Sequence, residues 1–256
     1  DQTTYIKLLG DTAGKPFTVT GSTTNGGAAD TQTLTISTPT AATGPNHWSD
    51  ADNWSGNSVP IAADDVVIEN SSDSIKYGMD QSAVTLTSLR VLQSFTGDIG
   101  LPRDAGSYAE YRDQYLKISA TTVTIGEGEG SGSGRIKLNL GSVASTVNVL
   151  NSAAGSETGL EAVLLIGTSI TSLNVSRGEV GVAVFAGEVA TITTIRETAP
   201  LGNTEIRCGS GCTLTTIDKS GGTLETNSAV TTLTQTDGST THLAGAMTTL
   251  NLRGGT

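Results

Sequence analysis

One short pattern of apolar and polar positions recurs along most of the chain. It consists of an apolar or small residue, two Thr or Ser residues and a second apolar residue, which is typical of a short strand with one buried face. Its eight copies begin at Leu86, Ala120, Ala144, Ile170, Ile192, Leu214, Val230 and Met247. A second set of strand-like segments alternates with them, including 136–140, 163–166, 180–184, 205–208, 223–226 and 241–244. Gly, Asn and Asp residues between the two sets indicate turns.

The spacing of the copies predicts how these strands are arranged. By subtraction, the start numbers of successive copies differ by 34, 24, 26, 22, 22, 16 and 17. A recurrence of this length with the same residue types in the same places is typical of a solenoid, in which each strand pairs with its equivalent one turn later. We therefore predict an all-β fold, a single-stranded parallel β-helix over 45–256 that tapers towards the C-terminus. The alternative is an antiparallel sandwich or barrel, which hairpins over 170–252 would establish.

Residues 1–44 do not take part in the repeat. Their strand-like segments 5–9, 17–20 and 33–36 are separated by runs of Gly, Ser, Thr and Asn, and a Thr/Ala/Pro linker follows. This stretch has too few apolar residues for a core of its own. We predict an extended N-terminal arm that lies on the rod or on another subunit, with Tyr5 and Phe17 as candidate contact residues.

Both tryptophans of the chain, Trp48 and Trp54, fall where the repeats begin, and the strand-like segment 64–68 follows them. Two large rings can close the end of a narrow core, burying about 150–250 Å² each. We predict that 45–68 form an N-terminal cap with Trp48 and Trp54 as its structural residues. A platform that stacks on carbohydrate is the alternative.

Composition and charge narrow the possible partners. The chain carries 42 Thr, 26 Ser and 32 Gly, while aromatic residues make up 4% and charged residues 15%. Few large apolar side chains are enough to fill the core of such a β-helix, because each turn needs only a few inward Val, Ile or Leu residues. The net charge of −11 repels phosphate backbones, so no nucleic-acid partner is expected. No stretch reaches the roughly 18 apolar residues that span a bilayer, and no membrane partner is expected.

Residue types that carry chemistry are scarce. His47 and His242 are the two histidines, and neither lies in a nucleophile motif. The Gly-rich run 126–134 lacks the spacing of a calcium loop, and Cys208 and Cys212 lack further ligands for zinc. We expect two free thiols, with a small disulfide as the alternative in an oxidising compartment. We predict no catalytic residue, no cofactor, no metal and no enzymatic activity.

Acidic residues recur through the C-terminal half and are interleaved with basic ones. They are Glu161, Glu179, Glu188, Glu197, Glu205, Asp218 and Glu225, with Arg177, Arg196, Arg207 and Lys219 between them. A glycosidase needs a carboxylate pair in a groove, whereas alternating signs favour compensating charge ladders. We interpret these residues as solvated ladders on the surface.

The insertion 97–117, between the first two copies, concentrates Tyr and Arg. These residue types are enriched in protein interfaces. The candidate interface residues are Arg103, Tyr108, Tyr111, Arg112 and Tyr115. We predict a lateral loop that contacts a subunit or partner, and the alternative is a loop packed flat on its own rod.

Two segments resemble known proteins. The order W-S-D-x-x-N-W-S from Trp48, then V-P and D-D-V-V-I up to Ile68, resembles the opening of right-handed β-helix segments in bacterial surface proteins and in phage or prophage structural proteins. The segment from Gly97 to Lys117 resembles one that follows that opening in phage-encoded structural proteins. The resemblance covers about 46–118 and implies a right-handed β-helix in a capsid decoration, cement or head-fibre-like protein.

On this resemblance we expect a non-enzymatic virion structural protein that is assembled in the host cytoplasm and lies on the capsid exterior. Its arm and lateral loop would dock on the major capsid protein. A homo-oligomer is expected, and the resemblance favours a trimer. Two rivals stay open: an extracellular adhesin or passenger domain of a bacterial cell surface, and a tailspike-like domain that binds or cleaves a host surface glycan.

Overall fold

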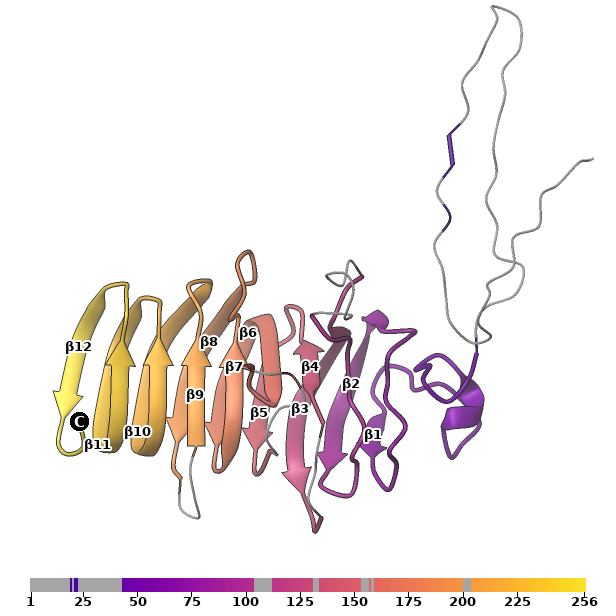
Figure 1. Cartoon of the computed structure of the whole chain (residues 1–256), viewed down its shortest axis with the longest axis horizontal. Helices are drawn as coiled ribbons and strands as arrows, with labels where there is room; N and C mark the ends of the chain where they lie inside the picture. The colour runs from indigo at the N-terminus through magenta and orange to yellow at the C-terminus, as the bar shows by residue number, and fades with distance from the viewer. Residues whose placement is uncertain are drawn as a thin grey trace, which may run out of the picture.

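The computed structural model of the protein describes residues 19, 21–22, 43–103, 112–130, 134–152, 157, 159–199 and 204–256. A one-turn 3-10 helix, η1 (Ala51–Asn53), precedes the strands, which succeed one another along an elongated stack (Figure 1). The strands are β1 (Asp65–Ile68), β2 (Asp80–Leu92), β3 (Leu116–Glu127), β4 (Ile136–Asn139), β5 (Ser145–Val149), β6 (Val163–Val175), β7 (Gly178–Val182), β8 (Ala190–Glu197), β9 (Thr204–Cys208), β10 (Cys212–Thr226), β11 (Val230–His242) and β12 (Met247–Leu252). The predicted arm, including Tyr5 and Phe17, lies almost wholly outside the described residues.

All pairings between the named strands are parallel and form two ladders. The first ladder runs through β1, β2, β3, β5, β6, β8, β10, β11 and β12. The second runs through β3, β4, β6, β7, β9, β10 and β11. Long strands such as β6 and β10 serve in both ladders and shift register where the chain bends from one to the other. The predicted all-β class and parallel pairing are confirmed, and the antiparallel alternative is excluded for the described part of 170–252.

The register joins equivalent positions of the predicted repeat. The apolar column of the first ladder is Val66, Leu89, Val123, Val147, Leu173, Ile195, Ile217, Leu233 and Leu250. From Leu89 onward these residues are 34, 24, 26, 22, 22, 16 and 17 positions apart, by subtraction of their numbers. These intervals equal those between the sequence motifs, so each motif occupies the same place in its own turn.

The core is a narrow column between the two ladders. The first-ladder column from Val66 to Leu233 is at most 4% exposed, whereas its last member, Leu250, is 51% exposed. The second ladder contributes Ile99, Ile136, Val163, Val180, Ile206 and Leu224 to the same buried cluster. A few aliphatic side chains per turn therefore suffice to fill the interior.

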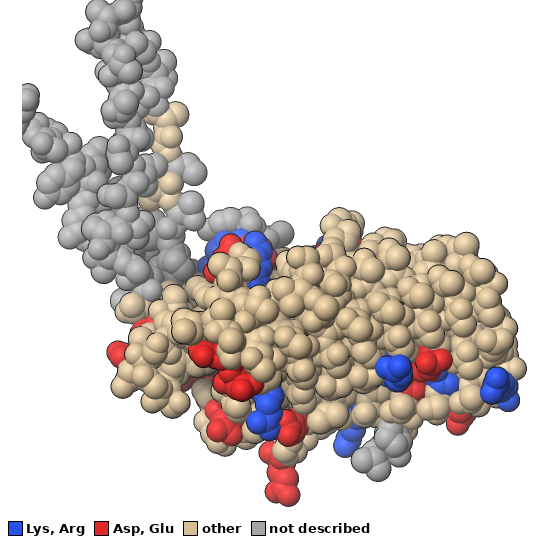
Figure 2. Space-filling model, turned by 180° about the vertical axis from the view of Figure 1, so that it is seen from behind, with Lys and Arg blue, Asp and Glu red and all other residues tan. Residues whose placement is uncertain are grey.

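A hydroxyl column runs along the outside of the first ladder. Its members are Ser88, Thr122, Thr146, Ser172, Thr194, Thr216, Thr232 and Thr249. Stacked Thr and Ser suit a pleated, partly wet surface and account for much of the composition. Figure 2 shows a mostly uncharged face, with the charged side chains of the described residues gathered towards its lower edge and beside one projection at its upper edge.

Candidate functional site

The two tryptophans lie at the N-terminal end of the stack. Trp48 is 1% exposed and belongs to the core cluster, and Trp54 is half-buried against it. Their ring centroids are 4.7 Å apart at an interplanar angle of 66°, and Trp54 Nε1 donates to the Trp48 carbonyl at 2.8 Å. His47 stacks beside Tyr77 with 4.9 Å between ring centroids. A carbohydrate platform needs exposed ring faces, whereas Trp48 presents its rings to the interior, which is the geometry that a cap requires.

A polar network covers the outer side of the second ladder where the lateral segment returns to the rod. We define this lateral cluster as Asp98, Gln114, Arg135, Lys137 and Glu157. Lys137 Nζ lies 2.9 Å from Glu157 Oε2 and donates to Gln114 Oε1 at 3.1 Å, although the Lys137 side chain is fully buried. Arg135 lies 3.0 Å from Asp98 Oδ2 and 3.6 Å from Glu157 Oε2. The cluster ties the segments around residues 98, 114 and 157 to β4.

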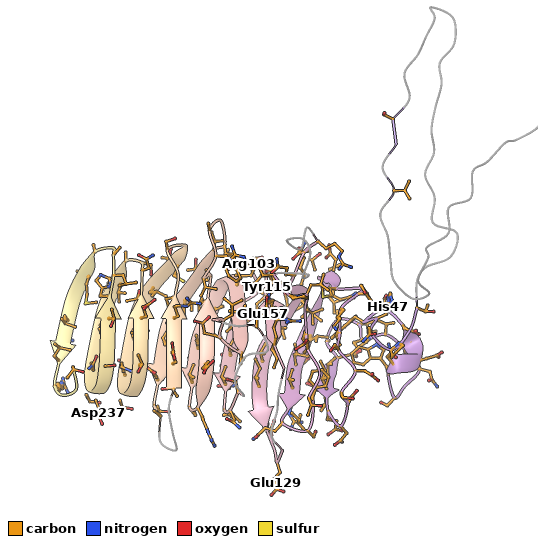
Figure 3. The ribbon with its side chains drawn as sticks, in the orientation of Figure 1. His47, Arg103, Tyr115, Glu129, Glu157 and Asp237 are labelled. Carbon is orange, nitrogen blue, oxygen red and sulfur yellow. The ribbon has the colours of Figure 1, made fainter. Side chains whose placement is uncertain are left out.

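Two of the predicted interface residues, Arg103 and Tyr115, lie beside Glu157 of this cluster (Figure 3). The backbone N–H of Arg103 donates to Glu157 Oε1 at 2.6 Å, and its guanidinium lies 4.2 Å from the centroid of the Phe185 ring. Tyr115 is 5% exposed, and burial together with the neighbouring Glu188 carboxylate raises its pKa. Arg112 lies 5.7 Å from the Tyr77 ring centroid. Tyr115 thus packs on its own rod, while Tyr108 and Tyr111 lie outside the described residues and their interface role stays a prediction.

Lys137→Met is expected to loosen the lateral segment without unfolding the rod. Burial lowers the pKa of Lys137 against the opposing effect of Glu157. Because Arg135 still neutralises Glu157, we expect a local cost of about 1–2 kcal/mol. The Leu101 amide, which donates to the Gln114 carbonyl at 2.9 Å, should then exchange with solvent about tenfold faster. Hydrogen exchange followed by mass spectrometry measures this. Lys117→Met removes an exposed ion pair with Asp113 and should leave that amide unchanged.

A second ion pair lies inside the stack. Glu197 and Lys219 occupy equivalent positions of β8 and β10, both side chains are fully buried, and Lys219 Nζ lies 2.5 Å from Glu197 Oε2. Lys219 also donates to the Gly221 carbonyl, and Thr204 Oγ1 donates to Glu197 Oε1 at 2.6 Å. Burial raises the pKa of the Glu197 carboxyl, which its hydrogen bonds with Lys219 and Thr204 oppose. The expectation of solvated charge ladders is therefore wrong for these two residues.

Strand parity explains their inward direction. Successive side chains alternate between faces, so Glu197 and Lys219, two positions after the inward Ile195 and Ile217, also point inward. Gln235 follows Leu233 in the same way and is fully buried, donating to the Gly238 carbonyl at 2.8 Å. The three polar residues form one column in register. This parity was readable in the sequence, and it identifies sites that our interpretation of the charges missed.

Gly222 leaves room for the buried carboxylate. Its φ is +65°, and a Cβ there would lie 1.8 Å from Thr204 Oγ1 and 2.2 Å from Glu197 Oε1. Gly187 has a φ of +85° with open space around the same position. In both alanine variants the new residue must adopt a left-handed backbone conformation, which is strained. Only Gly222→Ala also forces a Cβ against neighbouring atoms, so this variant should be less stable than Gly187→Ala by about 1–3 kcal/mol. Urea unfolding of the two variants measures the difference, and equal stability would contradict the proposed cradle.

The other acids beside the second ladder differ in burial, since Glu161 is buried and Glu179 is half-buried. Arg207 forms a two-pronged ion pair with Glu161, which is 6% exposed. Glu179 is in register with Glu205, and its pKa is raised by partial burial and by the charges of Glu205 and Glu161. The ladder therefore combines one compensating pair with one repulsive pair of like charges, and the expectation of a solvated acid is wrong for Glu161 as well.

Glu179→Gln is expected to stabilise the protein at pH 7 by about 0.2–1 kcal/mol, because like charges on neighbouring strands repel. A raised pKa means that folding favours the protonated carboxyl, whose contribution to stability is full below about 4.5, its ordinary value, and is lost as pH rises. The gain should therefore vanish at pH 4 in thermal unfolding. Glu127→Gln is the control, and its effect on stability should have the opposite sign. The hydrogen bond with Arg90 lowers the pKa of Glu127, so folding favours the ionised carboxylate that this variant removes.

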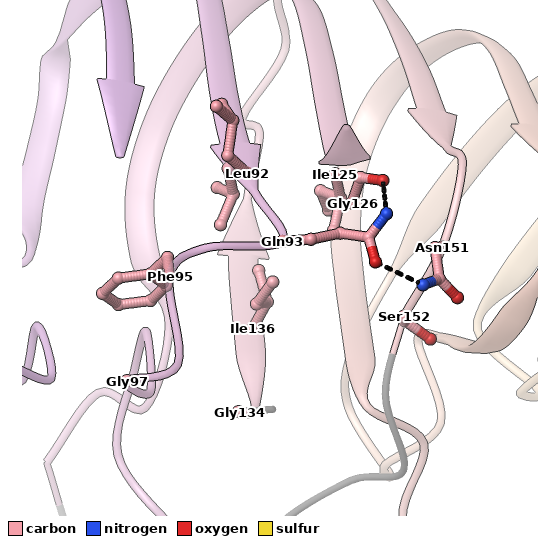
Figure 4. Close-up of a pocket in the computed structure, with 11 residues that line it drawn as sticks. Leu92, Gln93, Phe95, Gly97, Ile125, Gly126, Gly134, Ile136, Asn151 and Ser152 are labelled. Carbon is pink, nitrogen blue, oxygen red and sulfur yellow. Dashed lines mark hydrogen bonds between the residues drawn. The ribbon is translucent and has the colours of Figure 1, made fainter. Parts of the chain in front are cut away.

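A recess lies near β2 and β3. Its lining includes Gln93, Gly126, Asn151 and Phe95 (Figure 4). Gln93 Nε2 donates to the carbonyls of Gly126 and Gly128 at 3.0 and 2.7 Å, and Asn151 Nδ2 donates to Gln93 Oε1 at 2.8 Å. These polar groups bind one another and hold the corner of the Gly-rich run to the next turn.

The two cysteines are free thiols in the core, 1% and 7% exposed for Cys208 and Cys212. The hydrogen bond with Cys212 and burial raise the pKa of Cys208. Among the described residues, no group of three or more His, Cys, Asp and Glu could hold a metal ion. Within the same part of the chain, no helix is long and apolar enough to cross a membrane.

Comparison of the chain with family models, with curated proteins and with solved structures found no match.

Proposed function

We propose that the protein is a non-enzymatic structural component of a phage particle, a capsid decoration, cement or head-fibre-like protein. Its stack would be a right-handed single-stranded parallel β-helix that narrows where the last turns shorten, preceded by the extended arm 1–44. The observation that carries the proposal is the continuous buried column from Val66 to Leu233, which makes the chain a stiff spacer. The W-S-D-x-x-N-W-S opening and the segment 97–117 support the phage assignment by resemblance.

In this proposal the rod projects from the capsid and its N-terminal part makes the contact. The lateral cluster supports the assignment because it fixes the base of the lateral loop on β4, next to Arg103. A rigid base lowers the entropy lost when a loop docks on a partner. The major capsid protein is the proposed partner, with the chain acting as a homo-oligomer, a trimer in the favoured form.

The location of the protein tests the proposal. Particles released by the encoding culture are banded in a density gradient, and an antibody against the full chain follows the protein through DNA-containing particle fractions and cell envelopes. Co-banding with particles is the expected result. A band confined to envelopes would establish the adhesin alternative and overturn the phage assignment. New reducing ends from host polysaccharide incubated with the purified chain would overturn the non-enzymatic assignment.

A variant pair tests the docking side. Particles stripped of the protein are incubated with purified full chain, and bound protein is quantified. Arg103→Glu is expected to reduce retention at least tenfold, because a rim charge at the contact is reversed. Arg253→Glu changes an exposed arginine that follows β12 at the C-terminal end of the stack, and it should bind like the unaltered chain. Equal binding of both variants would place the contact elsewhere.

A further inference from the structure

The buried pair Glu197–Lys219 has the arrangement of a reaction site as well as that of an ion pair. The amine nitrogen and the carboxyl oxygen are 2.5 Å apart, and neither side chain is exposed to solvent. Both backbones are fixed by parallel pairing between β8 and β10, which continues up to and includes this position. Two reactants held in contact by a rigid scaffold gain the effective concentration of an intramolecular reaction.

The carboxyl is also polarised from the side opposite the amine. Thr204 Oγ1 donates to Oε1 at 2.6 Å, and the backbone N–H of Thr223 donates to the same carboxyl group. Fixed hydrogen-bond donors on a carboxyl group stabilise the negative charge that develops on its oxygens during acyl transfer. Lys219 in turn donates to the Gly221 carbonyl, which orients the amine towards Glu197.

Acyl transfer needs both groups in their neutral forms. Transfer of a proton from the ammonium to the carboxylate converts two charges in an apolar interior into a neutral amine and a neutral acid. The raised pKa of Glu197 has the same direction. The neutral amine is the nucleophile, and the acid supplies a leaving oxygen that already carries the first proton.

We propose that Lys219 and Glu197 condense to an amide that links neighbouring turns of the rod covalently. Lys219 Nζ forms a bond to Glu197 Cδ, and the bond from Cδ to Oε2 breaks. The second proton leaves the nitrogen for Oε2, so one water molecule is released and no electron donor or acceptor is involved. Oε1, held by Thr204, becomes the amide oxygen.

Two other lysine–carboxylate pairs of the chain show why this pair is singled out. Lys117 Nζ also lies 2.5 Å from a carboxylate oxygen, that of Asp113, but the two side chains are 33% and 47% exposed and stay hydrated ions. Lys137 is buried against Glu157, yet Arg135 also faces that carboxylate, which is therefore shared between two cations. Glu197 combines complete burial with hydroxyl and N–H donors.

Mass spectrometry of the purified full chain under denaturing, reducing conditions tests the proposal. The expected mass is lower than the sequence mass by one water molecule. Trypsin should fail to cleave after Lys219, and peptide 197–207 should be found joined to 208–253. Lys219→Arg should have the full sequence mass and release 197–207 as a free peptide. Peptides containing Lys117 and Asp113 should be unlinked in both proteins, as the exposed control.

Three outcomes would overturn the assignment. A full sequence mass with cleavage after Lys219 means that the pair is an ordinary ion pair. A link at Lys137 means that the chemistry belongs to the lateral cluster. Loss of ammonia instead of water, with Lys219 joined to Gln235, means that the amide carbonyl comes from the next turn. Because the readout is the mass of the unfolded chain, each outcome is independent of where the protein is located.

Discussion

Leu173→Ala is expected to lower the free energy of unfolding by about 3–5 kcal/mol, because it opens a cavity in a column that cannot close around it. Leu173 is fully buried and has Val147 and Ile195 as its neighbours in register. Both neighbours are fixed by main-chain pairing, so little relaxation can offset the lost contacts.

The matched control is Leu250→Ala, the same change in the same column. Leu250 is 51% exposed and has a register partner, Leu233, on one side. Its truncation should cost less than about 1 kcal/mol. Guanidinium unfolding followed by circular dichroism compares the two variants. The dependence of the unfolding free energy on guanidinium concentration should be the same for both, which shows that they expose the same surface on unfolding. Similar losses at both positions would show that the column does not contribute according to burial.

Lys219→Met should destabilise the protein at pH 7 by about 3–5 kcal/mol, because it leaves the Glu197 carboxylate buried without a cation. Adding Glu197→Gln to the same chain should restore the part of the loss that comes from the unpaired charge, since a neutral amide can still accept from Thr204. As an exposed control, Arg90→Met frees Glu127 and should leave the free energy of unfolding nearly unchanged.

The stability of the Lys219→Met variant should also depend on pH. The pKa of Glu197 is raised in the folded protein, and Lys219→Met removes a group that opposes the rise. Folding then favours the protonated acid, whose stabilisation is full below its ordinary value of 4.5 and is lost as pH rises through the folded value. The gap between Lys219→Met and the double variant should therefore narrow from pH 7 to pH 4. A gap that stays constant across this range would mean that Glu197 is not ionised in the variant.

The repeat was predictable because a stack imposes the same demand on each turn. Leu173, Ile195 and Ile217 each follow two hydroxyl residues, and the register joins them as the motif spacing requires. Each interval between motifs in the sequence therefore separates two residues that pair in neighbouring turns. The tryptophans were also recognisable, because two large rings in a chain of small residues have few places to be buried.

The charged residues were harder to place, since charge alone predicts a wet surface. Lys137 is buried by contacts with Gln114 and Glu157, which belong to other segments of the chain. The sequence around Lys137 does not predict these contacts. Glu197 and Lys219 followed the strand alternation, but the assumption that charges face solvent outweighed it. Pairing between one turn and the next makes their burial possible, and that pairing appears only when the turns are stacked.

The pairing of β11 with β12 has a mechanical consequence. Interior turns are held by strand pairing on both ladders, whereas β12 pairs with β11 in the first ladder, and in the second ladder Thr256 alone exchanges backbone hydrogen bonds with Gly238 and Thr240. Under tension along the axis, successive turn-to-turn contacts bear the same load in series, so the weakest contact determines the rupture force. A pull on the C-terminal end should therefore peel β12 away first and leave the turns between β2 and β10 intact.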